Sequence, residues 1–321
     1  MPWSVLLLAL CFCAAGPGIA GTASEKGGDE APGAWFSMPS FGQLGLLEIV
    51  GEIRDSRPAI NQIRRFERNP LVKGIVLRID SPGGEVGAVQ EIFSELVNYR
   101  GHGKSYRPVV ASFGGVSASG GYYLACAADR IYTNPGTLTG SIGVVIEFIE
   151  VEELMKKVGV RVVTIKSGRF KDTGNFSRSM DQEEMRVLQR TVNDVNEQFF
   201  EIVWDSRKAA LKTAVAKSRK IKAAGVSDGE AQAFLRSVAD GRVMSGRQAF
   251  NSGLADELGG LEDAIDAAAG MAGIRGRPSL VYEKRKTESG WFDFLGNVLH
   301  LPGLSSCAQP EGRIRLKYLL H

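Results

Sequence analysis

The sequence predicts an α/β fold with a doubly layered core, and three observations support this prediction. Two continuous apolar runs of strand type, residues 44–53 and 72–79, flank residues 54–69, whose apolar side chains recur at helical spacing. A short helical crossover between two such strands implies a parallel layer. The same order of strand, loop and helix recurs along the chain, with glycines at the crossings. With 321 residues, 44% of them hydrophobic and 23% charged, the chain can bury one large core or two small ones.

The first twenty residues predict a signal peptide or a short membrane anchor. Residues 3–20 are uncharged and mostly apolar, with leucines at their centre and small residues following. Pro17 and its flanking glycines disfavour the alternative, a buried core helix. Residues 21–42 are rich in Gly, Pro, Ser and charge, so we interpret them as a flexible linker. We therefore expect the main domain, residues 43–282, to lie outside the cytoplasm.

The end of the second strand carries a pattern suited to anion binding. Residues 80–84 read Asp-Ser-Pro-Gly-Gly, and an amphipathic helix begins at about Val86. Glycines between a strand and a helix leave bare backbone N–H groups where an oxyanion could be held. An ordinary turn that starts the helix is the alternative interpretation.

A third strand, residues 108–113, leads into glycine pairs that flank two serines. Residues 114–121 read Gly-Gly-Val-Ser-Ala-Ser-Gly-Gly, and residues 122–128 predict a helix. The glycines allow a tight turn and close backbone approach, and free N–H groups at a helix start favour developing negative charge. Ser119 is therefore a candidate nucleophile, with an ordinary Gly/Ser turn as the alternative.

The rest of the chain continues the alternation and ends in a tail. A Gly/Thr-rich loop at residues 135–145 leads into a strand, and the basic residues 208–222 predict a solvated helical face or, alternatively, contact with acidic lipid headgroups. From residue 283 the chain predicts an irregular, amphipathic tail. The remaining elements are strands at 130–133, 160–165 and 314–320, and helices at 151–158, 181–207, 228–239 and 261–271.

Lys171 is a candidate general base in the loop after the expected strand 160–165. A lysine acts as a base only if its ammonium group loses a proton, which requires burial or a neighbouring positive charge. Phe170 could supply that burial, whereas a solvated Lys171 that pairs with Asp172 is the alternative. These residues alone leave the choice open.

Few histidines and cysteines are available for other kinds of site. None of the three histidines, His102, His300 and His321, has an obvious catalytic context, so a Ser-His-Asp triad is poorly supplied. Beyond the N-terminal apolar run, Cys126 and Cys307 form neither a disulfide framework nor a metal site. The net charge of +3 is small and gives no argument for nucleic acid. We expect no cofactor, no metal and no nucleic-acid partner.

Five motifs follow one another at characteristic separations. They are LRIDSPGG at residues 77–84, SASGGYY at 117–123, GSIGV at 140–144, Lys171-Asp172 with Gly174, Arg178 and Met180, and the set GRV, GRQA and GLAD within 241–256. Together they resemble the signal peptide peptidase A family in its short, single-domain form. The resemblance covers about residues 44–273.

The resemblance implies a Clp/crotonase-like layered core of repeated β-β-α units with a helical extension, and a serine endopeptidase that uses a Ser-Lys dyad. By matching motifs, Ser119 is the nucleophile and Lys171 the general base, an accepted variant of triad chemistry. Backbone N–H groups near Gly84 and Gly120 would form the oxyanion hole. Ser141 would hydrogen-bond and orient Lys171.

The resemblance also implies the setting of the enzyme. Its relatives form membrane-bound homo-oligomeric rings, in which the lysine can come from the neighbouring subunit. Their substrates are remnant signal peptides and other apolar segments, so we expect a cell-membrane location with the active domain on the extracytoplasmic side. Residues 208–226 and the tail after 283 depart from the family pattern, which leaves substrate entry and assembly open.

Two other functions stay open at this point. A crotonase-type acyl-CoA enzyme would share the layered core and the glycine-lined oxyanion geometry, although the N-terminal apolar run counts against it. A non-catalytic membrane scaffold of the same fold is the other alternative, and an intact dyad argues against it.

Overall fold

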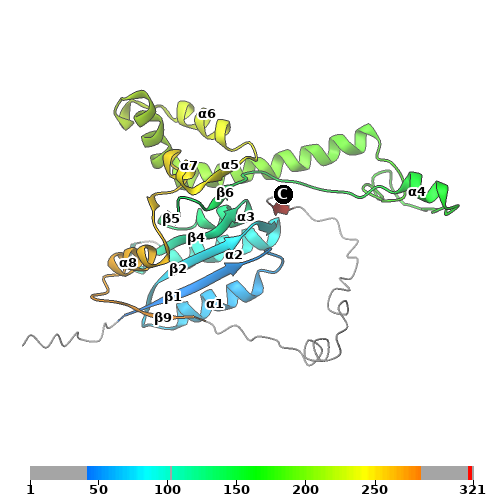
Figure 1. Ribbon diagram of the computed structural model, residues 1–321. Coiled ribbons are helices and arrows are strands. Elements are labelled where there is room, and N and C mark those ends of the chain that lie inside the picture. Colours follow the sequence, from blue (N-terminus) through cyan, green and yellow to red (C-terminus); the bar gives the residue numbers. More distant parts are fainter. Residues whose placement is uncertain (1–41, 102, 283–316, 320–321) are drawn as a thin grey trace, which may run out of the picture. The chain divides into compact units, whose positions relative to one another are not determined.

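The computed structural model describes residues 42–101, 103–282 and 317–319. Within them an eight-stranded sheet runs in the order β7-β6-β4-β2-β1-β9, with β5 beside β4 and β8 beside β5 (Figure 1). All of its strand pairs are parallel except β6 with β7, so the predicted α/β class is confirmed. The strands are β1 (Gln43–Val50), β2 (Val72–Ser81), β4 (Val109–Ala118), β5 (Arg130–Thr133), β6 (Leu138–Gly140), β7 (Val243–Ser245), β8 (Glu257–Leu258) and β9 (Ser279–Val281).

Helices cover both faces of this sheet. Because successive side chains of a strand point to opposite faces, Leu77 and Ile79 of β2 pack into one apolar cluster and Val76 into another. The first cluster contains the apolar faces of α1, α2, α3 and α5, and the second contains that of α8. These helices are α1 (Arg57–Arg68), α2 (Val86–Arg100), α3 (Gly120–Ala125), α5 (Gln182–Arg219) and α8 (Leu261–Met271).

The long helix α5 joins the core to an exposed segment. It begins with a capping box, in which the Asp181 carboxylate accepts the N–H groups of the first turn. Its middle part is buried on the core, where the Phe199 ring lies 5.0 Å from the Tyr123 ring. The helix continues beyond the predicted end at residue 207, and its basic last turns pair with acidic residues of α6 (Asp228–Val238). The solvated helical face predicted for residues 208–222 is therefore built from ion pairs within the chain.

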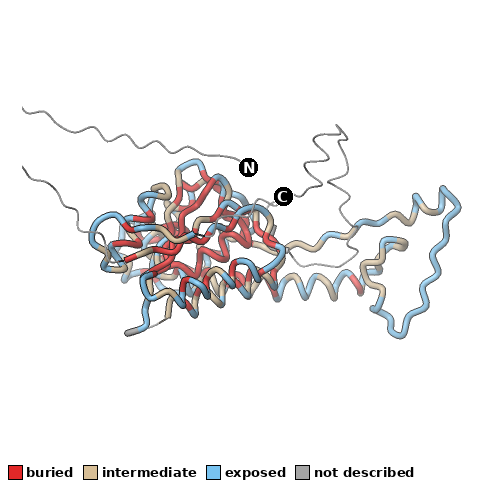
Figure 2. The backbone as a smooth tube through the Cα atoms, turned by 90° about the horizontal axis from the view of Figure 1, so that it is seen from below, coloured by how far each residue is buried: buried red, intermediate tan, exposed pale blue. Residues whose placement is uncertain are grey.

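Three expectations about strands require correction. The loop at 135–145 does not lead into a strand; it contains one, β6. Strand β4 does not end at Phe113 but runs on to Ala118, because the second half of the strand pairs with β6. Residues 160–165 do not form a strand and are fully part of an exposed segment, in which Val163 and Ile165 keep 74% and 96% of their surface (Figure 2). A strand needs a hydrogen-bonding neighbour, and the described part of the chain supplies none for this run.

Short elements complete the described chain. Helices α4 (Glu152–Lys157) and α7 (Gly246–Asn251) lie in connections, while β3 (Gly83–Glu85) pairs antiparallel with β10 (Lys317–Leu319). Strand β10 confirms part of the strand predicted at 314–320. The predicted signal or anchor segment, nearly all of the linker, and the tail outside β10 lie outside the described residues. None of the described helices combines the length and apolar character that crossing a bilayer requires.

Candidate active site

Ser119 occupies a strained corner between β4 and α3. Its backbone lies at φ 53° and ψ −115°, a conformation that costs a non-glycine residue about 1–3 kcal/mol and persists only where its surroundings hold it. The Ser119 N–H donates to the Gly140 carbonyl at 2.8 Å, and its own carbonyl accepts the Tyr123 N–H at 2.9 Å. The side chain is buried, and its Oγ has no hydrogen-bond partner among the described residues. A buried, unpaired hydroxyl at a strained position is typical of a reactive group.

The backbones of Gly84 and Gly120 meet beside this serine. A Cβ added to Gly120 would lie 3.2 Å from the Gly84 nitrogen, so a side chain at Gly120 would crowd the Gly84 backbone. Strand β3 is fixed from its other side, where Ile53 bonds to Gly83 and Glu85 at 2.8 Å each. Since peptide groups alternate along a strand, the N–H of Gly84 points away from Ile53. The structure thus brings together Ser119, the predicted nucleophile, and the two glycines predicted to form the oxyanion hole.

An extended segment of the chain itself lies along β3. Strand β10 runs antiparallel to it, with Tyr318 opposite Gly84 and Leu319 opposite Gly83. The side of β3 that faces β10 is therefore the side to which the Gly84 N–H points. An extended segment therefore already occupies this edge of the site.

Ser141 lies next to the residue that fixes Ser119. It follows Gly140 directly, has a positive φ of 50°, and donates its N–H to the Arg242 carbonyl at 2.8 Å. The side chain is 7% exposed and borders a cavity of about 410 Å³. The walls of this cavity come from the loop after β6, from α5 and from the segment before β7, and they include Val192, Asn196 and Asp240. Arg242 pairs with Asp240 and lowers the pKa of that carboxyl to about 2.

Lys171 is not brought to this corner within one chain. It is exposed, no residue from 143 to 183 is buried, and its side chain makes no hydrogen bond or ion pair with the described residues. Its loop is tied to Glu184, and the 15 residues of α5 from there to Phe199 span about 22 Å. Figure 1 shows this loop beside α4, at the end of α5 away from the sheet. Phe170 does not bury the lysine, because it is 41% exposed and lies under Arg169.

The expected alternative partner of Lys171 is engaged elsewhere. Asp172 accepts two hydrogen bonds from the Arg178 guanidinium, at 2.8 and 2.9 Å, and one from Lys166. Arg178, and then Lys166, hold the pKa of this carboxyl well below its usual range. Lys171 is thus exposed, as that alternative interpretation holds, but its expected pairing with Asp172 is wrong.

Three hydroxyl groups that the sequence motifs do not mark as functional support the end of β4. Thr137 donates to the Gly114 carbonyl at 2.6 Å, and Thr139 donates to the Ser117 carbonyl at 2.7 Å. Ser117 in turn donates to the Ile79 carbonyl at 2.7 Å. All three are buried, so β2, β4 and β6 are locked together below Ser119. The threonines of the loop at 135–145 were the available signal.

A second support holds α3 against the core. The Tyr122 hydroxyl donates to the Leu254 carbonyl at 2.8 Å, and burial raises the pKa of this phenol well above its usual value. Beside it, the Arg207 guanidinium forms two 2.8 Å bonds to the Asp256 carboxylate and one of 3.0 Å to the Gly253 carbonyl. Helix α3 and its serine are thus anchored to α5 and to the segment after α7.

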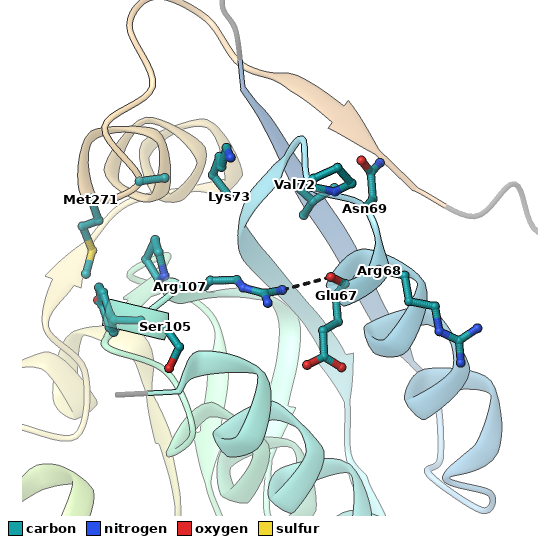
Figure 3. A pocket seen from close by; sticks show the side chains of 12 residues that line it. Glu67, Arg68, Asn69, Val72, Lys73, Ser105, Arg107 and Met271 are labelled. Carbon is teal, nitrogen blue, oxygen red and sulfur yellow. Dashed lines mark hydrogen bonds between the residues drawn. The ribbon is translucent and has the colours of Figure 1, made fainter. Parts of the chain in front are cut away.

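A cavity larger than the one beside Ser141 lies elsewhere and holds none of the predicted site residues. It measures about 490 Å³ and is lined by residues that precede β2 and β4, together with Met271 of α8 (Figure 3). Arg107 donates to the Glu67 carbonyl across it at 3.3 Å. This position is at the amino ends of the parallel strands, whereas Ser119 follows the carboxyl end of β4, where ligands of open α/β sheets bind.

Comparison with known proteins decides the family. The model of peptidase family S49 matches residues 102–275, a range that contains Ser119, Ser141 and Lys171. The chain belongs to peptidase family S49. It is therefore a member of a family of serine proteases, as the five motifs predicted.

Relatives of this S49 protease occur in several kinds of organism. A protein of Synechocystis sp. named as a protease is 37% identical over 240 residues, which are 74% of this chain and 78% of that protein. Protease 4 of Salmonella typhi is 33% identical over 215 residues, 67% of this chain and 31% of the other. A protein of Enterococcus faecium named as a signal peptide peptidase is 32% identical over 208 residues, 65% of this chain and 54% of the other.

Proposed function

We propose that this S49 protease is a membrane-associated endopeptidase that cleaves extended apolar peptides, remnant signal peptides among them, through a Ser119–Lys171 dyad. Lys171 takes the proton of the Ser119 hydroxyl, whose oxygen attacks the peptide carbonyl. The N–H groups of Gly84 and Gly120 stabilise the oxyanion. The same lysine then protonates the leaving amine, and water hydrolyses the acyl-enzyme.

The pairing of β10 with β3 is the observation that carries this proposal. An extended backbone already lies antiparallel along the strand that contains Gly84. A substrate bound in the same way would pair its main chain with β3 and place alternate side chains in neighbouring pockets. Ser119 precedes Gly120, whose backbone lies against Gly84, and its buried hydroxyl has no partner among the described residues. This geometry favours a peptide substrate over a thioester ligand.

The position of Lys171 supports catalysis between two copies of the chain. Because its loop is held about 22 Å along α5 from the core contact at Phe199, a second copy is needed to deliver the amine. The loop region also exposes apolar side chains, such as Ile149 at 78% and Ile165 at 96%, which monomeric proteins rarely gather on one segment. In a homo-oligomeric ring these side chains would be covered. Lys171 would enter beside Ser141, at the cavity that this serine borders.

Two further features support the membrane setting and the finer fold. The apolar residues 3–20 would direct or anchor the chain with its active domain on the extracytoplasmic side. The relative from Enterococcus faecium is named as a signal peptide peptidase, which agrees with an apolar substrate class. The parallel sheet, with glycines meeting at its carboxyl edge, fits a Clp/crotonase-like core.

Single substitutions at the dyad test the proposal. Ser119→Ala and Lys171→Ala should each abolish cleavage of an apolar peptide, and the double variant should be no worse than either one, because dyad members act as a unit. A serine-directed covalent inhibitor should label wild type at Ser119. Near-normal turnover by Lys171→Ala would show that another group is the base. Ser141→Ala should reduce kcat more than it changes KM, if Ser141 orients the lysine.

A further inference from the structure

A compact charge cluster lies between the Lys171 loop and the first turn of α5. Arg178 is at its centre and bonds to both oxygens of Asp172, at 2.8 and 2.9 Å, and to both oxygens of Glu184, at 2.5 and 2.8 Å. Lys166 donates to Asp172 at 2.5 Å, and Thr173 donates to Glu184 at 3.1 Å. The side chains of Asp172 and Glu184 keep only 9% and 2% of their surface, although the segment around them is exposed.

This cluster controls the acid that lies closest to Lys171 in the chain. A carboxylate beside an ammonium group stabilises the charged form and so opposes its use as a base. Here the two carboxylates, Asp172 and Glu184, are balanced by the two cations, Lys166 and Arg178. Both oxygens of Asp172 are occupied by these cations, and Lys171 bonds to neither. The lysine thus has no counter-charge from its own neighbour.

Three more acids, two at the start of α5 and one at the proposed entry point, are paired with arginines. Arg169 bonds to Asp181, the N-cap of α5, and forms an ion pair with Glu183 in its first turn. In the cavity beside Ser141, Asp240 pairs with Arg242 at 2.6 Å. Among the described residues the Lys171 side chain is exposed. A lysine carried into this cavity would therefore meet neutralised acids on both sides.

We infer that Arg178 is a positioning residue for the reaction: it withholds Asp172 from Lys171 and fixes the loop, so that the lysine reaches the nucleophile as a free amine. This inference rests on the proposed role of Lys171 as the base. A clamp that only held the loop in shape would have the same contacts. The two roles differ in what they do to the pH dependence of the reaction.

The decisive measurement is the pH profile of kcat/KM for an apolar peptide, using the full chain. In Arg178→Ala, Lys166 still bonds to one oxygen of Asp172, but the other oxygen loses its donor and pairs with Lys171, which then keeps its proton to higher pH. A nearby opposite charge at an exposed site moves such a titration by about one pH unit, which gives about a tenfold loss at neutral pH that recovers in alkali. Adding Asp172→Asn to this variant removes the carboxylate and should return the rising limb of the pH profile to its wild-type position. The single variant Arg178→Lys should show a smaller shift of this limb than Arg178→Ala.

Matched controls separate the possible outcomes. Arg169→Ala removes an ion-pairing arginine of the same loop that does not touch Asp172, and it should leave the limb in place. A loss of activity in Arg178→Ala that is equal at every pH, and that Asp172→Asn does not reverse, would overturn the inference. If Lys171→Ala itself kept wild-type turnover, the proposed base would be wrong. If Lys171→Ala were inactive but the pH profile of kcat/KM were the same in Arg178→Ala as in wild type, only the positioning role of Arg178 would be overturned.

Discussion

Replacement of Gly84 by alanine tests the oxyanion strand directly. The added Cβ would lie 2.0 Å from the Ile53 carbonyl oxygen and 2.6 Å from its nitrogen, and these backbone atoms cannot rotate away. Strand β3 must then shift by about 1 Å, and a displacement of this size at a catalytic group costs about 100-fold in rate. The shift also breaks the two 2.8 Å hydrogen bonds that join Ile53 to β3. Each of these hydrogen bonds contributes about 0.5–1.5 kcal/mol, so their loss lowers the free energy of unfolding by about 1–3 kcal/mol.

The assay combines steady-state cleavage of an apolar peptide with urea unfolding. Gly84→Ala should lose kcat by about 100-fold or more, as expected when an oxyanion donor is displaced, while the protein remains folded. Gly87→Ala is the matched control, since Gly87 is exposed in α2 and an added Cβ meets nothing within 4 Å. That change should keep wild-type kcat and raise the free energy of unfolding by about 0.5–1 kcal/mol. A folded Gly84→Ala with wild-type kcat would refute the assignment.

Three further predictions address stability, acidity and the C-terminal strand. Arg207→Met should lower the free energy of unfolding in urea by about 3 kcal/mol, because it leaves the Asp256 carboxylate without its buried cation, and an unchanged midpoint would contradict this. Arg178 lowers the pKa of Glu184 to about 2. The stability that this carboxylate gives the loop is therefore complete above about pH 4.5 and is lost as the pH falls towards 2. Hydrogen exchange at the start of α5 should become faster between about pH 4.5 and 2 and should not change above that range. Removing residues 317–321 should lower KM by freeing β3, and Tyr318→Pro should do the same. If both variants kept the wild-type KM, β10 would not compete with substrate.

Local pattern was sufficient for the elements that lie against the sheet. Helix α8 occupies the predicted residues, and β2 begins where its apolar run begins, because burial on a sheet face imposes the periodicity that the sequence displays. The corner at Ser119 was also predicted from its glycines. Those glycines mark close backbone approach between Gly84 and Gly120, although the first pair, at 114–115, lies within β4 rather than in a turn.

The features that the sequence could not predict depend on partners far away in the chain or outside it. Strand β3 has only three residues, and its strand partner, β10, comes from the far end of the chain. Residues 160–165 have strand composition, but they have no neighbour in the described chain to pair with. Asp172 prefers Arg178 to the adjacent Lys171, because the turn after it brings the guanidinium within bidentate reach. Such long-range choices leave no periodic signal.

The central claim is that Ser119 of one copy is activated by Lys171 of another, and mixing two inactive variants tests it most directly. Ser119→Ala and Lys171→Ala chains should each be inactive alone. Unfolded together at equal amounts and refolded, they should recover about one quarter of wild-type activity, because about one neighbouring pair in four unites an intact serine with an intact lysine in a head-to-tail ring. No recovery in mixed oligomers of normal size would contradict the account.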